Sequence, residues 1–334
     1  MIEKNVSLKR FNTFGIDARA ETLITVSSEE EVTRLIRSGD AAGPLLILGG
    51  GSNLLFISDF KGTVIKTDIQ GINEHYTENG NRIISAGAGV NWDAFVGWSV
   101  DKGLGGAENL SLIPGCVGAV PVQNIGAYGA EASEIIYKVR ALSLETGDVR
   151  EFSREECRFG YRESIFKQEL KSRYLISEVW FSLSLNPEFR IGYGSLREEI
   201  ERIGKPDLKT IREAVTGIRR SKLPDPSVIG NAGSFFKNPV IEQTHAEKLI
   251  SRFHDMPVYD DISGGKKIAA GWLIEKCGWK GKRVGNVGTS PDHALIICNF
   301  GNATGSEVLE FAMRIKEEVT NKFGIKLEEE VNIL

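Results

Sequence analysis

Cysteine and histidine are scarce in this sequence, and neither occurs in a recognisable metal-binding or disulfide pattern. The four cysteines, Cys116, Cys157, Cys277 and Cys298, lie far apart and show no Cys-x-x-Cys spacing. This argues against a disulfide framework and against a zinc site. The four histidines are equally scattered, with no His-Glu-x-x-His pair and no acidic EF-hand loop. We therefore expect no bound metal.

Long apolar runs and long basic runs are also missing. No apolar run approaches the ~20 residues that span a bilayer, and the first residues, Met1 to Asn5, contain no apolar signal region. Lys and Arg number 41 against 45 Asp and Glu, which gives a net charge of -4 and argues against nucleic acid as a partner. We expect a cytoplasmic protein with neither a membrane nor a nucleic-acid partner.

The familiar phosphate-binding motifs are absent as well. No Gly-Lys-Ser or Gly-Lys-Thr ends a glycine-rich turn, which excludes a P-loop, and no Gly-x-Gly-x-x-Gly opens a helix, which excludes a Rossmann fingerprint. The chain has 334 residues, and single cores rarely grow past about 250–300 residues. Two or three domains are therefore expected.

What the sequence does have is glycine, 37 residues in all, and many of these occur in clusters. The apolar run Leu45–Leu48 is typical of a buried strand and leads directly into Gly49-Gly50-Gly51-Ser52-Asn53. A strand that ends in such a turn can direct several backbone N–H groups at one point, which is a nest for phosphate.

A second glycine-rich stretch, from Gly105 to Gly129, is long, small in its side chains and nearly uncharged. Glu108 is its one charged residue, and Pro114 and Pro121 prevent a regular helix or central strand. Loops this long inside a compact protein are usually functional. The small residues would let backbone amides lie against a large flat ligand, which suits a bound cofactor; the alternative is a buried structural crossover.

The remaining chain is predicted to contain both strands and helices. Residues 139–144 and 149–152 predict a hairpin, residues 306–323 a helix that ends at Gly324, and residues 327–334 a strand of period two. The stretch 229–239 has no amphipathic period, so we expect a loop or short bent strand. It gathers Asn231, Ser234, Lys237 and Asn238. An ordinary turn with two core phenylalanines would look similar.

Six motifs in this order resemble the UDP-N-acetylenolpyruvoylglucosamine reductase (MurB) family. They are residues 48–53, 113–129, 160–162, 223–226 and 230–239, and the terminal Leu-Glu-Glu-Glu-Val at 327–331. The likeness runs nearly end to end, from Asn12-Thr13-Phe14-Gly15 onward, and the segment 193–218 resembles that of the longer subtype, which carries a substrate-covering Tyr loop.

The resemblance implies an α+β protein with a FAD-binding fold of the vanillyl-alcohol-oxidase/PCMH type and a C-terminal α+β substrate-binding domain. The implied boundaries are residues 1–67 with 326–334 for a first FAD subdomain, 68–218 for a second, and 219–325 for the substrate domain. NADPH would reduce FAD, and hydride would pass to the enolpyruvyl group of a UDP-sugar to give UDP-N-acetylmuramate for peptidoglycan. We expect a monomer that acts on this small-molecule substrate.

The resemblance also implies residue roles. Ser234 would be the proton donor, Arg162 would bind the substrate carboxylate, and Glu330 would be the third catalytic residue. Lys222 and Asn238 would hold the diphosphate, Tyr193 would cover the substrate, and His293 would be a further contact. The FAD-binding residues would be Gly49, Gly50, Gly51, Ser52, Asn53, Pro114, Gly115, Gly118, Ala119, Asn124, Gly126, Ala127 and Tyr128. The resemblance implies that the backbone at 49–53 and 115–119 holds the pyrophosphate. It also implies that Asn124 and residues 126–128, which we call the flavin loop, flank the isoalloxazine ring.

Other interpretations remain open at this point. Arg162 could instead pair with Glu163, Tyr193 could be a turn residue, and Lys222 could be a surface lysine. Glu330 could be one of three solvated glutamates, and the family often has Pro where this chain has Glu329. A FAD-dependent hydroxy-acid oxidase or dehydrogenase, which needs an active-site base in place of Ser234, and a non-catalytic flavin-binding sensor are the competing functions.

Overall fold

The computed structural model describes residues 1–334 except 42 and 262–263. Its internal contacts divide the chain into two units, both of them discontinuous in sequence. The first unit consists of Met1–Val6, Ala20–Gly51 and Lys61–Arg219, and the second of Ser7–Arg19, Ser52–Phe60 and Arg220–Leu334. The three-part division expected from the resemblance stays a prediction.

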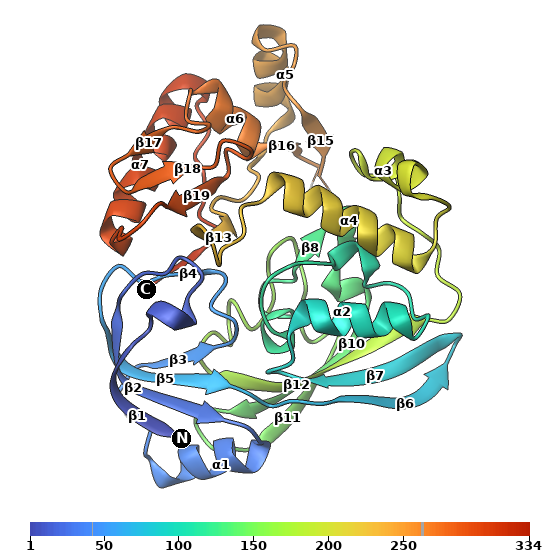
Figure 1. The fold of residues 1–334 in the computed structure, drawn as a ribbon, viewed down its shortest axis with the longest axis vertical. Helices are drawn as coiled ribbons and strands as arrows, with labels where there is room; N and C mark the ends of the chain where they lie inside the picture. Colours follow the sequence, from blue (N-terminus) through green and yellow to red (C-terminus); the bar gives the residue numbers. More distant parts are fainter. Residues whose placement is uncertain (42, 262–263) are drawn as a thin grey trace. The chain divides into compact units, whose positions relative to one another are not determined.

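A four-stranded sheet lies at the start of the first unit, in the order β1-β2-β5-β3 (Figure 1). Its strands are β1 (Ile2–Ser7), β2 (Arg19–Val26), β5 (Phe60–Thr67) and β3 (Leu45–Leu48). The predicted strand at Leu45–Leu48 is confirmed and pairs in parallel with β5, but of its four residues only Leu48 is buried. Helix α1 (Glu29–Ser38), whose N-cap is Ser28, packs Val32 and Leu35 into the core of this sheet.

The second sheet of this unit has five antiparallel strands in the order β11-β10-β12-β7-β6. They are β11 (Val149–Ser153), β10 (Ile136–Ser143), β12 (Tyr174–Ser184), β7 (Asn81–Gly87) and β6 (Ile72–Glu78). The predicted hairpin is confirmed as β10–β11. Helix α2 (Trp92–Asp101) lies on this sheet (Figure 1) and packs the ring of Phe95 4.6 Å from that of Phe181.

The long glycine-rich stretch after α2 contains only short elements. These are the 3₁₀ turns η2 (Glu108–Leu110) and η3 (Val117–Ala119), and the strand pair β8 (Gly126–Ala127) and β9 (Ala130–Glu131), followed by η4 (Ala132–Glu134). Helices α3 (Leu196–Ile203) and α4 (Leu208–Lys222) form a small core of their own, against which Tyr128 packs. The stretch is therefore held between α2 on one side and the α3–α4 core on another.

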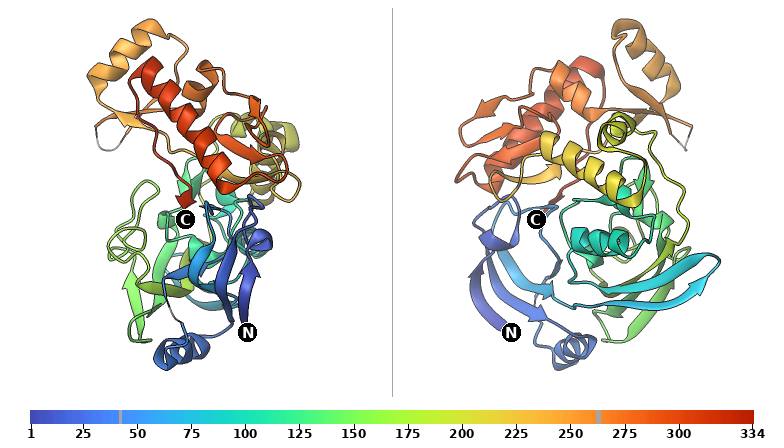
Figure 2. Two further views of the ribbon diagram at one scale, coloured as in Figure 1. Left: turned by 90° about the vertical axis from the view of Figure 1, so that its left-hand side faces the viewer. Right: turned by 45° about the vertical axis from the view of Figure 1, so that its right-hand side comes forward.

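The second unit is built on the antiparallel sheet β13-β19-β18-β17. Its strands are β13 (Gly230–Ser234), β19 (Ile296–Asn299), β18 (Val287–Thr289) and β17 (Arg283–Val284). Helix α7 (Gly305–Phe323) lies along β18 and β19 (Figure 2) and begins at a Thr304–Glu307 capping box. It ends at Gly324, as predicted. Helix α6 (Ala270–Lys276) packs beside it.

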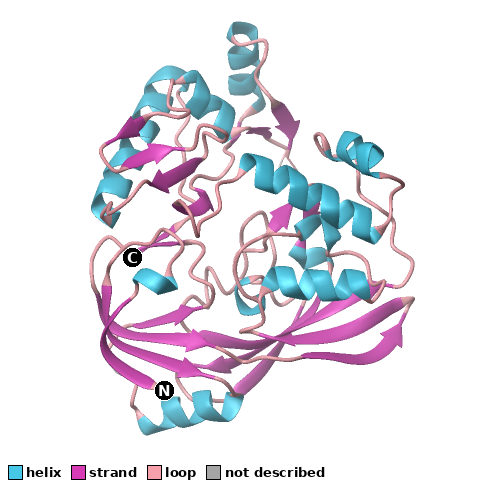
Figure 3. Ribbon diagram, in the orientation of Figure 1, coloured by secondary structure: helices cyan, strands magenta, loops and turns pink. Residues whose placement is uncertain are grey.

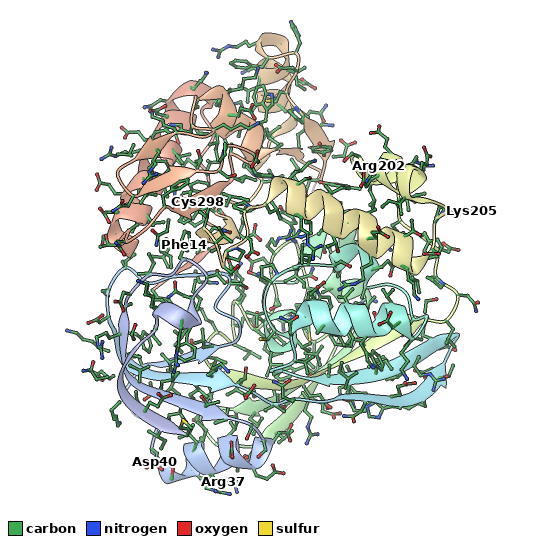
Figure 4. The ribbon with its side chains drawn as sticks, in the orientation of Figure 1. Phe14, Arg37, Asp40, Arg202, Lys205 and Cys298 are labelled. Carbon is green, nitrogen blue, oxygen red and sulfur yellow. The ribbon has the colours of Figure 1, made fainter. Side chains whose placement is uncertain are left out.

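A smaller sheet in this unit has the order β14-β16-β15. It consists of β14 (Val240–Ile241), β16 (Lys266–Ile268) and β15 (Val258–Asp260), with α5 (Gln243–Arg252) between β14 and β15 in the chain. The segment 7–19, with η1 (Lys9–Phe11), also belongs here. Its Phe14, labelled in Figure 4 together with Cys298 of β19, accepts a 2.9 Å hydrogen bond from Asn299 Nδ2 through its carbonyl oxygen.

The predicted strand at residues 327–334 is only partly correct. The chain first forms a single bridge between Glu329 and Phe236 and then changes partner, so that β20 (Asn332–Ile333) pairs in parallel with β4 (Leu54–Leu55). The period-two pattern indicated an extended chain, but a strand as an element requires one continuous partner, and here two partners share the segment.

Helices and strands are mixed in both units without a regular β-α-β alternation (Figure 3). The α+β class predicted from the sequence is confirmed. Among the described residues, no helix combines the length and apolar character needed to cross a bilayer.

Candidate cofactor and catalytic site

The two glycine-rich segments predicted to hold FAD phosphates meet in the first unit. A Cβ on Gly50 would lie 2.8 Å from the Cα of Gly115, so the two backbones are in direct contact. A Cβ on Gly49 would lie at an ordinary 3.7 Å from the Cβ atoms of Cys116 and Ala119. Positive φ angles at Gly51 (62°) and Gly115 (129°) make the turns that bring the segments together.

Backbone N–H groups in these segments are available to a ligand. Within the part of the chain that the structure describes, the N–H groups of Gly50, Gly115 and Cys116 donate to no protein acceptor. Converging N–H donors on glycine-rich backbone are suited to a pyrophosphate. The residues present therefore fit FAD, and Gly50, Gly115 and Cys116 would be its donors.

Gly118 and Ala119 have a different place in the same loop. The N–H of Gly118 donates to the carbonyl of Ala88 at 3.0 Å, and a Cβ on Gly118 would lie 2.6 Å from that of Ala88. The N–H of Ala119 donates to the carbonyl of Cys116. These two predicted FAD residues use their amides inside the protein and shape the loop. Gly51, Ser52, Asn53 and Pro114 lie at the two turns themselves, and Ser52 and Asn53 belong to the second unit.

Asn124, predicted to flank the flavin ring, is fully buried, and its side-chain amide makes three hydrogen bonds within the protein. Its Nδ2 donates to the carboxylate of Glu131 at 2.8 Å and to the carbonyl of Gly160 at 3.0 Å, and its Oδ1 accepts from Ser133 N–H at 2.9 Å. The side chain holds three loop segments together. The backbone at Asn124 has a φ of 44°.

The guanidinium of Arg162 contacts the backbone of the same predicted flavin loop. Its Nη2 donates to the carbonyl of Gly126 at 2.8 Å and its Nη1 to the carbonyl of Asn124 at 3.4 Å. A Cβ on Gly126 would lie 2.9 Å from Nη1, so a side chain at this position would displace the guanidinium. Arg162 also has a positive φ of 57°. Non-glycine residues in this conformation concentrate at functional sites.

The predicted substrate-covering residue, Tyr193, lies next to Tyr128 of the flavin loop. The two rings meet edge to face with centroids 6.2 Å apart, and Tyr193 is 55% exposed. Burial raises the pKa of Tyr128.

Two residues that were not predicted from the sequence join the flavin loop to the segment around Arg190. Buried Asn109 donates to the carbonyls of Tyr128 and Arg190, and Arg190 donates to the carbonyl of Gly129. The sequence feature that could have identified Asn109 is an amide side chain inside an otherwise apolar run.

In the second unit, Ser234 is the last residue of β13, opposite Ile296 of β19. The register shifts between Asn231 and Ser234, where Gly233 has φ of 71° and donates its N–H to Asn231 Oδ1 at 3.0 Å. Asn231 also donates to the carbonyls of Pro224 and Ile229. This bulge interrupts the regular register of the strand just before Ser234, whose side chain is half-buried.

The terminal glutamates meet the Ser234 strand. The N–H of Glu330 donates to the carbonyl of Phe235 at 2.8 Å, and Asn53 Nδ2 donates to the carbonyl of Glu330 at 3.1 Å. The structure thus brings together three predicted residues, Asn53, Ser234 and Glu330, in adjoining backbone. The carboxylate of Glu329 lies 2.6 Å from Lys316 Nζ and that of Glu328 3.6 Å from Lys237 Nζ.

The other predicted substrate residues are more dispersed. Asn238 Oδ1 accepts from the N–H of Ala270, the first residue of α6, at 2.9 Å. His293 lies against that helix too, its Cε1 3.9 Å from where a Cβ on Gly271 would be. Lys222 is the exposed last residue of α4. No group of three or more His, Cys, Asp or Glu side chains among the described residues is arranged to hold a metal ion.

Comparison with known proteins agrees with both halves of the chain. Residues 20–153 match a FAD binding domain, and residues 225–334 match the C-terminal domain of UDP-N-acetylenolpyruvoylglucosamine reductase. The protein of that name from Pseudomonas aeruginosa is 45% identical over 99% of this chain and 98% of its own length. This chain belongs to the UDP-N-acetylenolpyruvoylglucosamine reductase family.

Further relatives support the assignment. The reductase of Amoebophilus asiaticus is 44% identical over 100% of this chain and 99% of its own length. The crystal structure of the reductase (MurB) from Thermus caldophilus superposes with a TM-score of 0.69 at 27% identity, covering 100% of this chain and 98% of that one. The family resemblance is confirmed, and so is the predicted fold of a FAD-binding domain with the family's C-terminal domain.

Proposed function

We propose that the protein is a FAD-dependent UDP-N-acetylenolpyruvoylglucosamine reductase, that is, a UDP-N-acetylmuramate dehydrogenase of peptidoglycan precursor synthesis. The observation that carries the proposal is the end-to-end identity of 45% with a reductase of that name, over 99% of this chain. The meeting of two glycine-rich segments with N–H groups available to a pyrophosphate supports the cofactor.

Bound FAD, reduced by NADPH, would supply a hydride to the enolpyruvyl double bond. The chain's own residues then have to bind the substrate and deliver a proton to the neighbouring carbon. Ser234 is our candidate donor, held at the end of β13 by the bulge that Asn231 stabilises. A serine hydroxyl is a weak acid, so its donation depends on close alignment with a strongly basic carbanion.

Arg162 would stabilise the charge that develops on the substrate's carboxylate side. A guanidinium offers a planar fork that suits bidentate contact with a carboxylate. Its anchoring on the carbonyls of Asn124 and Gly126 supports a fixed orientation toward the flavin loop. Glu330 is our candidate third catalytic residue, and its backbone N–H donates to the carbonyl of Phe235, the residue that follows Ser234.

For the UDP part of the substrate we propose Lys222 and Asn238 at the diphosphate, Tyr193 as a cover, and His293 as a further contact. The edge-to-face contact of Tyr193 with Tyr128 supports a position for the cover next to the flavin loop. We also propose that the enzyme uses NADPH and acts in the cytoplasm as a monomer. Size-exclusion chromatography with light scattering checks the last point, and a dimer mass would contradict it.

The test of the function is an anaerobic two-step titration. Purified yellow protein is mixed with NADPH, which should bleach the flavin absorbance, and UDP-N-acetylglucosamine enolpyruvate is then added. The colour should return without oxygen and in step with product. A matched addition of UDP-N-acetylglucosamine, which lacks the enolpyruvyl group, is the control and should leave the flavin bleached.

Two outcomes would overturn the proposal. A protein that binds FAD but is never bleached by NADPH would be a flavin-binding sensor. Turnover of 2-hydroxy acids at a rate comparable to the enolpyruvyl substrate would indicate an oxidase or dehydrogenase instead.

A further inference from the structure

One residue directly before the predicted pyrophosphate loop has an unusual backbone conformation. Leu112 has a φ of 58° and is followed by Ile113, Pro114 and Gly115. Leucine is disfavoured in this left-handed region because its Cβ crowds the backbone. Such a conformation persists only where surrounding contacts impose it.

Both polar backbone groups of Leu112 are held by charged side chains. Its N–H donates to Asp93 Oδ1 at 2.6 Å, and its carbonyl accepts from Arg219 Nε at 3.2 Å. Hydrogen bonds to ionised groups are about twice as strong as neutral ones. The two charges therefore hold the same peptide segment from its donor side and its acceptor side.

Asp93 is itself held by Arg212 of α4. Nη1 and Nη2 of Arg212 lie 2.7 and 3.0 Å from the two carboxylate oxygens, and Nη1 also donates to Ser111 Oγ at 3.0 Å. Arg212 and Arg219 are seven residues apart, so they share one face of α4. Helix α4 thus fixes Asp93 and Leu112 together.

The start of α2 completes the arrangement. The N–H of Trp92 donates to the carbonyl of Gly115, and its indole Nε1 donates to the carbonyl of Leu110, at 3.0 and 2.9 Å. Residues 110, 112 and 115 are therefore all held by the first two residues of α2. The adjacent N–H groups of Gly115 and Cys116 are those that meet no protein acceptor among the described residues.

We propose that Asp93 and Arg212 are positioning residues for FAD: by holding Leu112 in its left-handed conformation, they direct the N–H groups of Gly115 and Cys116 at the cofactor's pyrophosphate. This inference rests on the proposed function only in that the ligand is FAD. Asp93 and Arg212 themselves need not touch it.

The test measures the dissociation constant of FAD for the apoprotein by flavin fluorescence. Asp93→Asn should raise the dissociation constant about tenfold, because a charge-assisted hydrogen bond is lost. Arg212→Lys, which keeps the charge but not the fork, should act in the same direction. Asp101→Asn at the other end of α2 is the matched control and should leave the constant unchanged.

A rescue experiment separates positioning from general stability. Glycine takes a positive φ without steric cost, so in the Leu112→Gly background Asp93→Asn should raise the dissociation constant less than about threefold. If the Asp93–Arg212 pair only stabilised the fold, Asp93→Asn would raise the dissociation constant of FAD by the same factor in the wild-type and Leu112→Gly backgrounds. That result would overturn the proposal. Circular dichroism of each apoprotein checks folding, and Arg212→Lys replaces Asp93→Asn in the cycle if the latter does not fold.

Unchanged FAD affinity in both single variants would likewise sink the inference while leaving the proposed function intact. Wild-type apoprotein that does not bind FAD at all would instead contradict the proposed function.

Discussion

The cofactor loops of the first unit and the Ser234 strand of the second unit are built in opposite ways. In the loops the groups offered to a ligand are backbone N–H groups, and Leu112, Asn124, Tyr128 and Arg162 all have positive φ. At the Ser234 strand the groups proposed to act are side chains, and the one positive φ between Gly230 and Asn238 is that of Gly233. Polar side chains in the loops, such as Asn124, are used to hold the backbone.

The difference predicts how each region should respond to substitution. Where the backbone is the binding surface, an added methyl group should be damaging and its cost should appear in cofactor affinity. Where the side chain is the reactive group, removal of one functional group should damage a chemical step and leave the cofactor bound.

The largest effect is expected from Ser234→Ala. NADPH should bleach the flavin at the wild-type rate, but reoxidation by the enolpyruvyl substrate should slow by about 10²–10⁴-fold, because a positioned proton donor contributes that much. Stopped-flow absorbance under anaerobic conditions measures both steps. Ser251→Ala, an exposed serine of the same unit, is the control, and normal reoxidation in Ser234→Ala would remove that residue from the donor role.

The terminal glutamates provide the next comparison. Glu330→Gln should lower kcat about 100-fold, whereas Glu329→Gln should retain kcat and lose at most about 1 kcal/mol of unfolding free energy, since its ion pair with Lys316 is partly exposed. Steady-state kinetics and urea unfolding of both variants decide the assignment. The reverse pattern would place the third catalytic residue at position 329.

Two neighbouring glycines test the backbone surface. Gly50→Ala should weaken FAD binding roughly tenfold or more, because its methyl group would lie 2.8 Å from backbone and overpacking costs about 1–3 kcal/mol. Gly49→Ala places its methyl group at 3.7 Å from side chains and should weaken FAD binding less than Gly50→Ala does. Fluorescence titration of the two apoproteins compares them, and equal affinities would contradict a tight backbone contact.

The smallest effect is expected at a charge pair of the first unit away from the loops. The hydrogen bond from Arg140 holds the pKa of Glu29 below its usual 4.5, with the Nε–Oε1 distance at 2.7 Å. Because the pKa of Glu29 is lower in the folded than in the unfolded protein, its charge stabilises the fold at pH values above the unfolded-state pKa. This stabilisation is lost as the pH falls through the folded-state pKa. Glu29→Gln should therefore cost about 1 kcal/mol or less at pH 7.

The same variant should lose this deficit in urea unfolding performed well below pH 4.5, and its FAD affinity should match wild type at pH 7. Glu317→Gln, an exposed residue of α7, serves as the control. A weakened FAD affinity in Glu29→Gln would contradict the view that side-chain charges matter to the cofactor only where they hold the loops.

Much of this arrangement was predictable from local patterns. The strand at 45–48, the hairpin of β10 and β11 and the helix α7 follow from periodicity and capping, which act within a few residues. The glycine clusters indicated two backbone-lined turns because only glycine permits such close approach. The order of six motifs was enough to name the family, which the full-length relatives confirm.

Other features depend on residues far apart in the chain. Nothing local shows that Gly50 lies against Gly115, that Asn109 joins Tyr128 to Arg190, or that Arg219 holds Leu112. The single strand predicted at the C-terminus was only partly correct for the same reason, since its residues change partner from Phe236 to β4. Composition and spacing determine which turns are possible; only the packed chain decides which amides remain without an acceptor, because hydrogen bonding depends on atoms being within about 3 Å in space.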